Sequence, residues 1–266
     1  MLLATLLLLA QDPGAQGLLR AAQDAYETQP RVEYEGALVR AQVLTWTSHT
    51  ARGTVALDPG ADAFRVDVSV EQARVDGSRR ITLMREGERY VFVDHDARTW
   101  TEGAEPGIGG LPSRLAYDMA QLFPAAPSEL LAAEPGLGEP TKLGERDCET
   151  VTAQLPEGPT AHVWHVDSAD RLPRLWRTKR DLGGGDTIDK QLTVRTLARR
   201  AEPLPAAQAP ADYARAEPVD WQDPEDADKA QAEGVFTELE GSVEPVREHF
   251  NSLKKHVRAL GLFAPT

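Results

Sequence analysis

Phe64-Arg-Val-Asp-Val-Ser-Val-Glu71 alternates strictly between apolar and polar residues. Successive side chains of a β-strand point to opposite faces, so the apolar residues share one face and the polar residues share the other. The apolar face holds Phe64, Val66, Val68 and Val70. One buried face and one solvated face are typical of an antiparallel sheet. The stretch therefore predicts a half-solvated antiparallel strand.

Runs of the same period recur on both sides of this stretch. The expected strands are 32–48, 53–58, 64–71, 79–85, 88–94, 148–155, 160–167, 172–180 and 186–198. Turn-forming sequences such as Asp58-Pro-Gly60 and Asp76-Gly-Ser78 separate them. Strands joined by short turns pair with their neighbours in sequence, so the pattern predicts one meandering sheet.

Two segments have helical spacing instead. Residues 14–28 place apolar side chains three and four apart, and Pro30 ends the pattern. In the middle of the strand region, Pro106-Gly-Ile-Gly-Gly110 leads into the apolar residues Leu111, Leu115, Met119, Leu122 and Phe123. Ser128 then opens a second short apolar turn. We expect an N-terminal helix and an inserted helical pair, which together with the sheet make an α+β fold.

The first ten residues, Met1-Leu-Leu-Ala-Thr-Leu-Leu-Leu-Leu-Ala10, form an apolar run of the length of a secretory h-region. The run is too short to span a bilayer. No Lys or Arg precedes it, since the first basic residue is Arg20. We expect residues 1–13 to be a signal peptide and the protein to be periplasmic or otherwise extracytoplasmic. The alternative is a buried N-terminal helix.

Composition excludes several classes of function. The chain of 266 residues has 42 acidic and 29 basic residues, a formal net charge of −13. Binders of nucleic acid or of anionic membrane surfaces normally need a basic patch, and none is visible. The single cysteine, Cys148, excludes an intrachain disulfide and any zinc site with two or more thiolates of one chain.

The last quarter of the chain has a different amino-acid composition. Residues 201–234 are rich in Pro, Ala and acidic residues and predict a flexible linker. Residues 235–266 predict a helical tail, and the ending Ala264-Pro-Thr266 resembles the approach to the Cys-x-x-Cys of a thioredoxin-like domain. One hypothesis is a reading frame cut at that site, through a selenocysteine codon read as a stop. The alternative is a C-terminal helix that folds back onto the sheet.

Four motifs resemble the bacterial outer-membrane lipoprotein carrier family, which has a half-barrel fold. They are Tyr34-Glu-Gly36, Tyr90-Val-Phe-Val-Asp94, Gly144-Glu-Arg-Asp-Cys-Glu-Thr-Val151, and His162-Val-Trp-His-Val-Asp167 followed by Leu172-Pro-Arg174. The resemblance covers residues 14–200. It implies a strongly curved antiparallel sheet whose apolar concave side accepts acyl chains. The 66 residues beyond it depart from the single-domain form of dedicated carriers.

A curved sheet with one apolar face and few helices to cover it leaves a dry cleft that suits lipid tails. The expected lining is Phe64, Val66, Val68, Val70, Ile188, Leu192 and Val194 from strands, with Leu115, Met119 and Phe123 from the inserted helix. The alternative is that these residues form a closed core.

The expected function is therefore non-catalytic binding of a lipid or other apolar ligand, without a cofactor. No nucleophile, base and orienting group can be placed together from the sequence. Two alternatives stay open: a sensor or scaffold that binds a basic periplasmic protein, and the sensor half of a redox protein whose catalytic domain is missing. Neither nucleic acid nor stable membrane insertion is expected.

Other chemistry-bearing residues have simpler interpretations. His162 and His165 lie three apart on a strand, so their side chains should point to opposite faces and hold no metal together. Asp94-His-Asp96 falls at an expected hairpin turn, where Asp is favoured. Cys148, without a second cysteine or a base, should pack as a small apolar residue.

Overall fold

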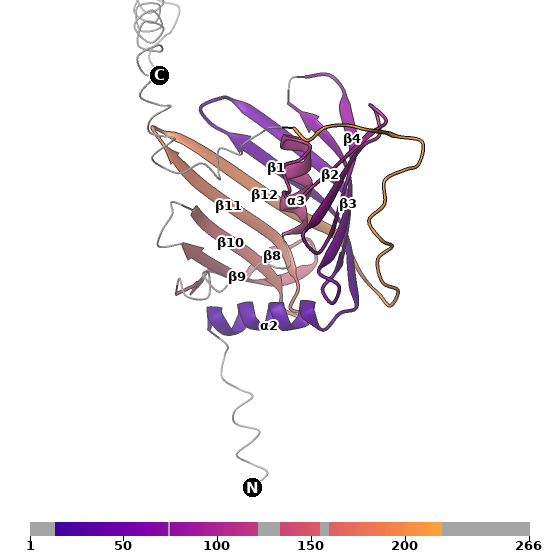
Figure 1. The fold of residues 1–266 in the computed structure, drawn as a ribbon. Coiled ribbons are helices and arrows are strands. Elements are labelled where there is room, and N and C mark those ends of the chain that lie inside the picture. The colour runs from indigo at the N-terminus through magenta and orange to yellow at the C-terminus, as the bar shows by residue number, and fades with distance from the viewer. Residues whose placement is uncertain (1–13, 74, 122–133, 155–159, 220–266) are drawn as a thin grey trace, which may run out of the picture.

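The computed structural model describes residues 14–73, 75–121, 134–154 and 160–219. Within these ranges the fold is one large, curved sheet with two helices (Figure 1). The helices are α2 (Ala15–Glu27) and α3 (Leu111–Ala120). The strands are β1 (Arg31–Gln42), β2 (Thr47–Asp58), β3 (Ala63–Gln72), β4 (Ser78–Glu86), β5 (Arg89–Asp94), β6 (Thr99–Gly103), β7 (Gly136–Leu137), β8 (Thr141–Leu143), β9 (Arg146–Gln154), β10 (Thr160–Asp167), β11 (Pro173–Gly183), β12 (Asp186–Arg200) and β13 (Ala214–Arg215).

The sheet consists of two antiparallel meanders joined at its centre. Its order is β13-β6-β5-β4-β3-β2-β1-β12-β11-β10-β9-β7, with β8 paired to β9. The first meander, β1 to β6, and the second, β9 to β12, meet where β1 pairs with β12 over its whole length. The expected meander is therefore correct within each half. The pairing that joins the halves connects residues more than 140 positions apart, which the local pattern does not reveal.

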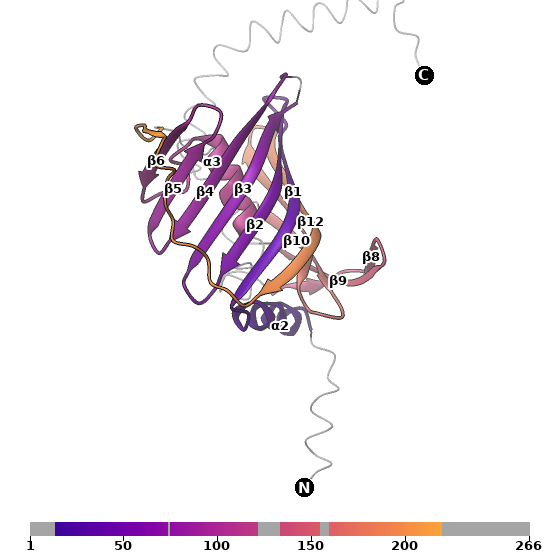
Figure 2. The ribbon, with the colours of Figure 1, turned by 90° about the vertical axis from the view of Figure 1, so that its right-hand side faces the viewer.

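Two glycines sit at the central strands where the sheet bends. Gly36 of β1 pairs with Gly53 of β2, and the β1–β12 register shifts between Glu35 and Gly36. A β-carbon at Gly53 would lie 2.1 Å from the backbone oxygen of Asp67 in β3. Glycine in a strand commonly marks a bend or a close backbone approach, and a bulge increases the local twist. Figure 2 looks onto the convex side of the first meander and shows the second meander turning away behind it.

The hydrophobic core fills the concave side of this trough. The face of β3 that Phe64, Val66, Val68 and Val70 share is buried, as its alternation predicts. Helix α3 lies on that side and contacts β1, β2, β3 and β4. Helix α2 lies across one end of the sheet, near β7 and β9 (Figure 1). Both helices occur where the sequence predicts them, while the second inserted turn at Ser128 lies outside the described residues.

The segment after β12 differs from its prediction. The sequence predicts a flexible linker from residue 201, but residues 201–219 run along the convex side of the first meander (Figure 2). Ala207 is buried there with Met84, Val91 and Val93, and β13 pairs in parallel with β6. The correction has a physical reason: the outer faces of β4 and β5 are apolar too, so they need a cover. The tail at 235–266 lies outside the described residues.

A turn also divides the expected strand 32–48. Residues 43–46 form a turn between β1 and β2 although they contain neither Gly nor Pro. The turn includes Trp46 at a φ of 54°. Bulky residues rarely adopt this left-handed region, which explains why turn-residue patterns do not mark this turn.

Candidate ligand-binding site

The predicted lining residues surround helix α3. On β3, Phe64, Val66, Val68 and Val70 are buried in the same cluster as Leu115 and Met119 of α3. On β12, Ile188 and Leu192 are buried and Val194 packs partly against the cluster. Phe123 lies outside the described residues. Eight of the nine described residues thus belong to or pack against one core that includes α3, and Ile188 is buried outside this cluster, so this part of the concave face is packed as in the closed-core alternative.

Space remains at the two ends of α3. A cavity of about 460 Å³ lies at the N-terminal end, against Leu111 and Pro112, and Val70 forms part of its wall. A second cavity, of about 450 Å³, lies at the C-terminal end, against Ala120 and Gln121, and Phe64 forms part of its wall. Both cavities border β3, so the helix separates two hollows that follow one strand.

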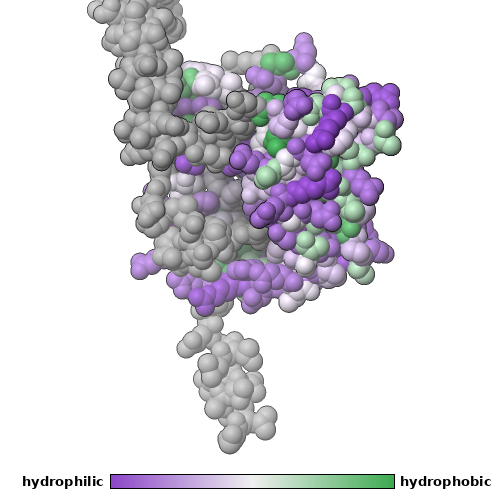
Figure 3. Space-filling model, viewed as in Figure 1, coloured by the Kyte–Doolittle hydropathy of each residue, from purple (hydrophilic) through white to green (hydrophobic). Residues whose placement is uncertain are grey.

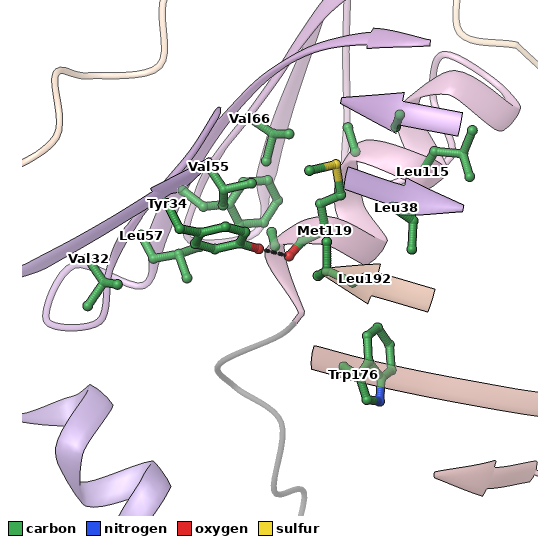
Figure 4. Close-up of a cluster of buried hydrophobic side chains, with 14 of the residues drawn as sticks. Val32, Tyr34, Leu38, Val55, Leu57, Val66, Leu115, Met119, Trp176 and Leu192 are labelled. Carbon is green, nitrogen blue, oxygen red and sulfur yellow. Dashed lines mark hydrogen bonds between the residues drawn. The ribbon is translucent and has the colours of Figure 1, made fainter. Parts of the chain in front are cut away.

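Polar contacts fix α3 on the apolar face. The Tyr34 hydroxyl donates a hydrogen bond to the backbone oxygen of Met119 (Figure 4). The Lys190 ammonium of β12 donates to the Asp118 carboxylate at 3.1 Å, and both side chains are buried. Arg114 lies 3.5 Å from the same carboxylate. Buried ionic groups cost desolvation unless paired, so these contacts place the helix in one position.

An aromatic cluster extends the concave face across the second meander. The His162 ring stacks on Trp164 of the same strand at 5.3 Å between centroids, and on Trp176 of β11 at 6.2 Å. The ammonium of Lys190 lies 5.9 Å from the centre of the Trp176 ring. The cluster therefore joins the apolar lining to the buried ion pair on α3.

Two ring nitrogens of this cluster have no hydrogen-bond partner among the residues that the structure describes. They are Nε1 of Trp164 and Nε2 of His162, and both atoms are buried. Trp176 Nε1 donates to Nδ1 of His162 at 3.4 Å, which leaves the proton of a neutral imidazole on Nε2. Both orphan nitrogens are then N–H donors. Buried donors are nearly always satisfied in folded proteins, so these two could bind an acceptor oxygen on a ligand.

Burial, and then the charge of Lys190, lower the pKa of His162 from 6.5 to about 4. The pKa of His162 is lower in the folded than in the unfolded protein. The free energy of unfolding is therefore undiminished by this group above pH 6.5, and it decreases as the pH drops toward 4. The linked loss should reach roughly 3 kcal/mol.

His162→Phe keeps a stacked ring and should remove most of this loss in urea unfolding at neutral and acidic pH. Burial also lowers the pKa of His49 and His165, so the difference between variant and parent isolates His162. An unchanged pH slope in His162→Phe would contradict the assignment.

Several residues to which the sequence assigns no functional role have partners in the structure. His165 bonds through Nδ1 to the Thr150 hydroxyl at 3.0 Å, on the face opposite His162, as predicted. Asp94 accepts the backbone N–H groups of Asp96 and Ala97, which confirms the turn. Cys148 is buried, and burial raises the pKa of its thiol. Within the described ranges, no group of three or more His, Cys, Asp or Glu side chains is placed to hold a metal ion.

Sequence reasoning missed the polar members of the site. Asp118 and Lys190 are charged residues at positions whose helical and strand neighbours are apolar. A charge on an otherwise apolar face is a signal that could have marked each of them. It could not have paired them, since they are 72 residues apart.

Comparisons with known proteins identify similar structures only. No protein-family model matches this sequence, and no curated protein matches it. The similar structures include an uncharacterised conserved protein from Thermus thermophilus, with 15% identity, a TM-score of 0.45, and coverage of 76% of this chain and 98% of that one. A structure of MucB has 17% identity and a TM-score of 0.45, with coverage of 77% of this chain and 65% of that one. A LolA superfamily protein from Nitrosomonas europaea has 12% identity and a TM-score of 0.34, with coverage of 71% and 95%.

Proposed function

We propose that this chain is an exported, non-catalytic binding protein that holds a lipid acyl chain or other apolar ligand on the concave face of its curved sheet. The observation that carries the proposal is the pair of hollows at the ends of α3, both bordered by the apolar face of β3. A single helix of 10 residues, about 15 Å long, separates them. An apolar ligand chain is the class that suits hollows bordered by such a face.

The walls of the two cavities combine apolar surface with a polar margin. At the N-terminal end of α3, Val70 and Leu111 share the lining with Arg79 and Asp76. At the C-terminal end, Leu57 and Phe64 share the lining with Arg85 and with the carboxylates of Glu27, Asp58 and Asp62. This composition suits a ligand with a hydrocarbon body and a polar end.

The orphan donors on β10 support the same class of ligand. Trp164 Nε1 and His162 Nε2 offer two N–H groups on the concave side, among aromatic rings. A carbonyl or ester oxygen would satisfy them without adding a charge to the apolar surroundings. A bound water would also satisfy them, and the ligand experiment distinguishes the two.

The test is extraction of the purified full chain with organic solvent, followed by mass spectrometry, together with displacement of a fluorescent fatty acid. We expect a co-purified lipid and saturable displacement. Leu111→Trp and Ala63→Trp place bulk at the rims of the two cavities and should each weaken binding of the fluorescent fatty acid about tenfold, if one good apolar contact of roughly 1.4 kcal/mol is lost.

Val39→Trp is the matched control, because Val39 is exposed on β1 and lines neither cavity at the ends of α3. It should bind like the parent. No extracted lipid and no displacement would support the closed core and reject the proposal. Circular dichroism of each variant separates lost binding from lost folding. Export is tested separately, by N-terminal sequencing of the protein from the extracytoplasmic fraction.

A further inference from the structure

Several large apolar side chains are exposed at one rim of the sheet. In the turn between β1 and β2, Val43 is 51% exposed, Leu44 50% and Trp46 80%. The neighbouring turn between β3 and β4 exposes 55% of Val75. The two turns are adjacent, since the N–H of Ala73 donates to the oxygen of Ser48 at 2.8 Å. Hydrophobic residues are visible at this upper end of the molecule (Figure 3), where Figure 1 places the turns.

The β1–β2 turn is held in place rather than frayed. The buried carboxylate of Asp186 accepts the amide of Gln42 at 2.7 Å and the backbone N–H of Leu44 at 2.8 Å. The N–H of Val43 donates to the oxygen of Thr187 at 3.0 Å. A charged hydrogen-bond acceptor from the next hairpin thus fixes a turn whose apolar side chains point to solvent.

Stability of the fold does not account for the residue at the tip. Trp46 has a φ of 54°, a region that Gly, Asn and Asp tolerate better than a bulky side chain. Its side chain is four-fifths exposed, so it contributes little burial in return. The fold alone would favour a smaller residue there.

The β1–β2 turn carries no formal charge, and in the sequence the β3–β4 connection places Arg74 and Asp76, of opposite sign, on either side of Val75. Residues 41–51 contain no Asp, Glu, Lys or Arg, in a chain that is 27% charged. Burial, and then the charge of Arg40, lower the pKa of His49, which favours the neutral form of this side chain. Beyond the next turn, Arg79 and Arg80 pair with Asp94 and Asp96. A charged protein partner or an anionic surface would find no opposite charge to bind on this uncharged apolar tip.

We infer that the apolar rim, formed by Val43, Leu44, Trp46 and Val75, inserts peripherally into the interface of a phospholipid bilayer. Amphipathic Trp rings favour this depth, where the ring is apolar and its N–H can bond to headgroup oxygens. The tip of the β1–β2 turn is uncharged, and Arg74 and Asp76 beside Val75 cancel in formal charge, which suits a zwitterionic interface. The cavity at the N-terminal end of α3 is lined by Val75 and His49, so insertion would bring that cavity to the membrane. The inference does not require that the cavity holds a lipid.

Flotation of the full chain with phosphatidylcholine vesicles tests the inference. We expect the parent to float with the vesicles, equally at low and high ionic strength, because no charge pair drives binding. Leu44→Ser should reduce the partition coefficient about tenfold, and Leu137→Ser should leave it unchanged. The control is closely matched, since Leu137 is 51% exposed on β7, outside the rim.

Trp46→Asn separates membrane binding from folding. Asn suits a positive φ, so the variant should melt at the same or a higher temperature and still lose flotation. The inference is overturned if the parent stays in solution, if Leu137→Ser loses as much as Leu44→Ser, or if only anionic vesicles bind and salt releases the protein. It is also overturned if Leu44→Ser abolishes self-association instead of flotation. Leu44→Ser should bind the fluorescent fatty acid as tightly as the parent, whether or not it binds vesicles. Loss of flotation with normal fatty-acid binding therefore concerns the rim alone, whereas a parent that binds no fatty acid contradicts the proposed function.

Discussion

Gly53→Val is expected to destabilise the protein by about 4 kcal/mol or more. The side chain of a valine would begin 2.1 Å from the backbone oxygen of Asp67 and 2.9 Å from the α-carbon of Val68. Both obstacles are backbone atoms of β3, so no rotamer change relieves the clash. Strands β2 and β3 would have to separate at the centre of the sheet.

Urea unfolding followed by circular dichroism measures this effect. Gly60→Ala is the control, because a β-carbon at Gly60 would have Asp58 Oδ1 as its nearest neighbour, at 3.6 Å. Its unfolding free energy should stay within about 1 kcal/mol of the parent. Similar losses in the two variants would show that close packing of β2 on β3 is not what Gly53 provides.

Asp118→Ala is expected to cost about 3 kcal/mol and to loosen α3. It removes the carboxylate that lies 3.1 Å from the buried ammonium of Lys190 and 3.5 Å from Arg114. Hydrogen exchange should then increase in the amides of residues 111–120 before it increases elsewhere in the sheet.

Asp212→Ala provides the contrast, since Asp212 pairs with Arg98 and both side chains are about two-thirds exposed. Removing this exposed pair should cost less than about 1 kcal/mol. The double variant Asp118→Leu/Lys190→Met replaces the buried pair by apolar groups and should recover most of the lost stability. Equal effects of Asp118→Ala and Asp212→Ala would show that the buried pair does not hold the helix.

Local patterns in the sequence predicted most of the elements. The alternation from Phe64 to Glu71 gives β3 and its buried face, because a strand has a period of two whatever it pairs with. Helical spacing likewise located α2 and α3. The meandering antiparallel sheet of the α+β class follows from these elements and their short turns, whereas its curvature was expected only from the resemblance to the lipoprotein carrier family.

The missed elements depend on tertiary contacts. The turn at 43–46 lacks turn-forming residues because Asp186, from another hairpin, supplies its hydrogen bonds. The sequence predicts a linker at 201–219 because the residues that this segment covers lie more than 100 positions earlier in the chain. These residues are Met84, Val91 and Val93. His95, assigned to a simple turn, also bonds through Nδ1 to the Tyr213 hydroxyl of this segment at 3.2 Å.

By itself, the sequence determined which residues are apolar and on which face of each strand or helix they lie, since backbone geometry converts spacing directly into a face. Only the tertiary structure decided that the concave face is packed around α3 with space at its two ends, and that Lys190 meets Asp118. The physical reason is that a cavity or a buried ion pair depends on how distant segments pack in three dimensions. Loop closure over such separations leaves no periodic trace along the chain.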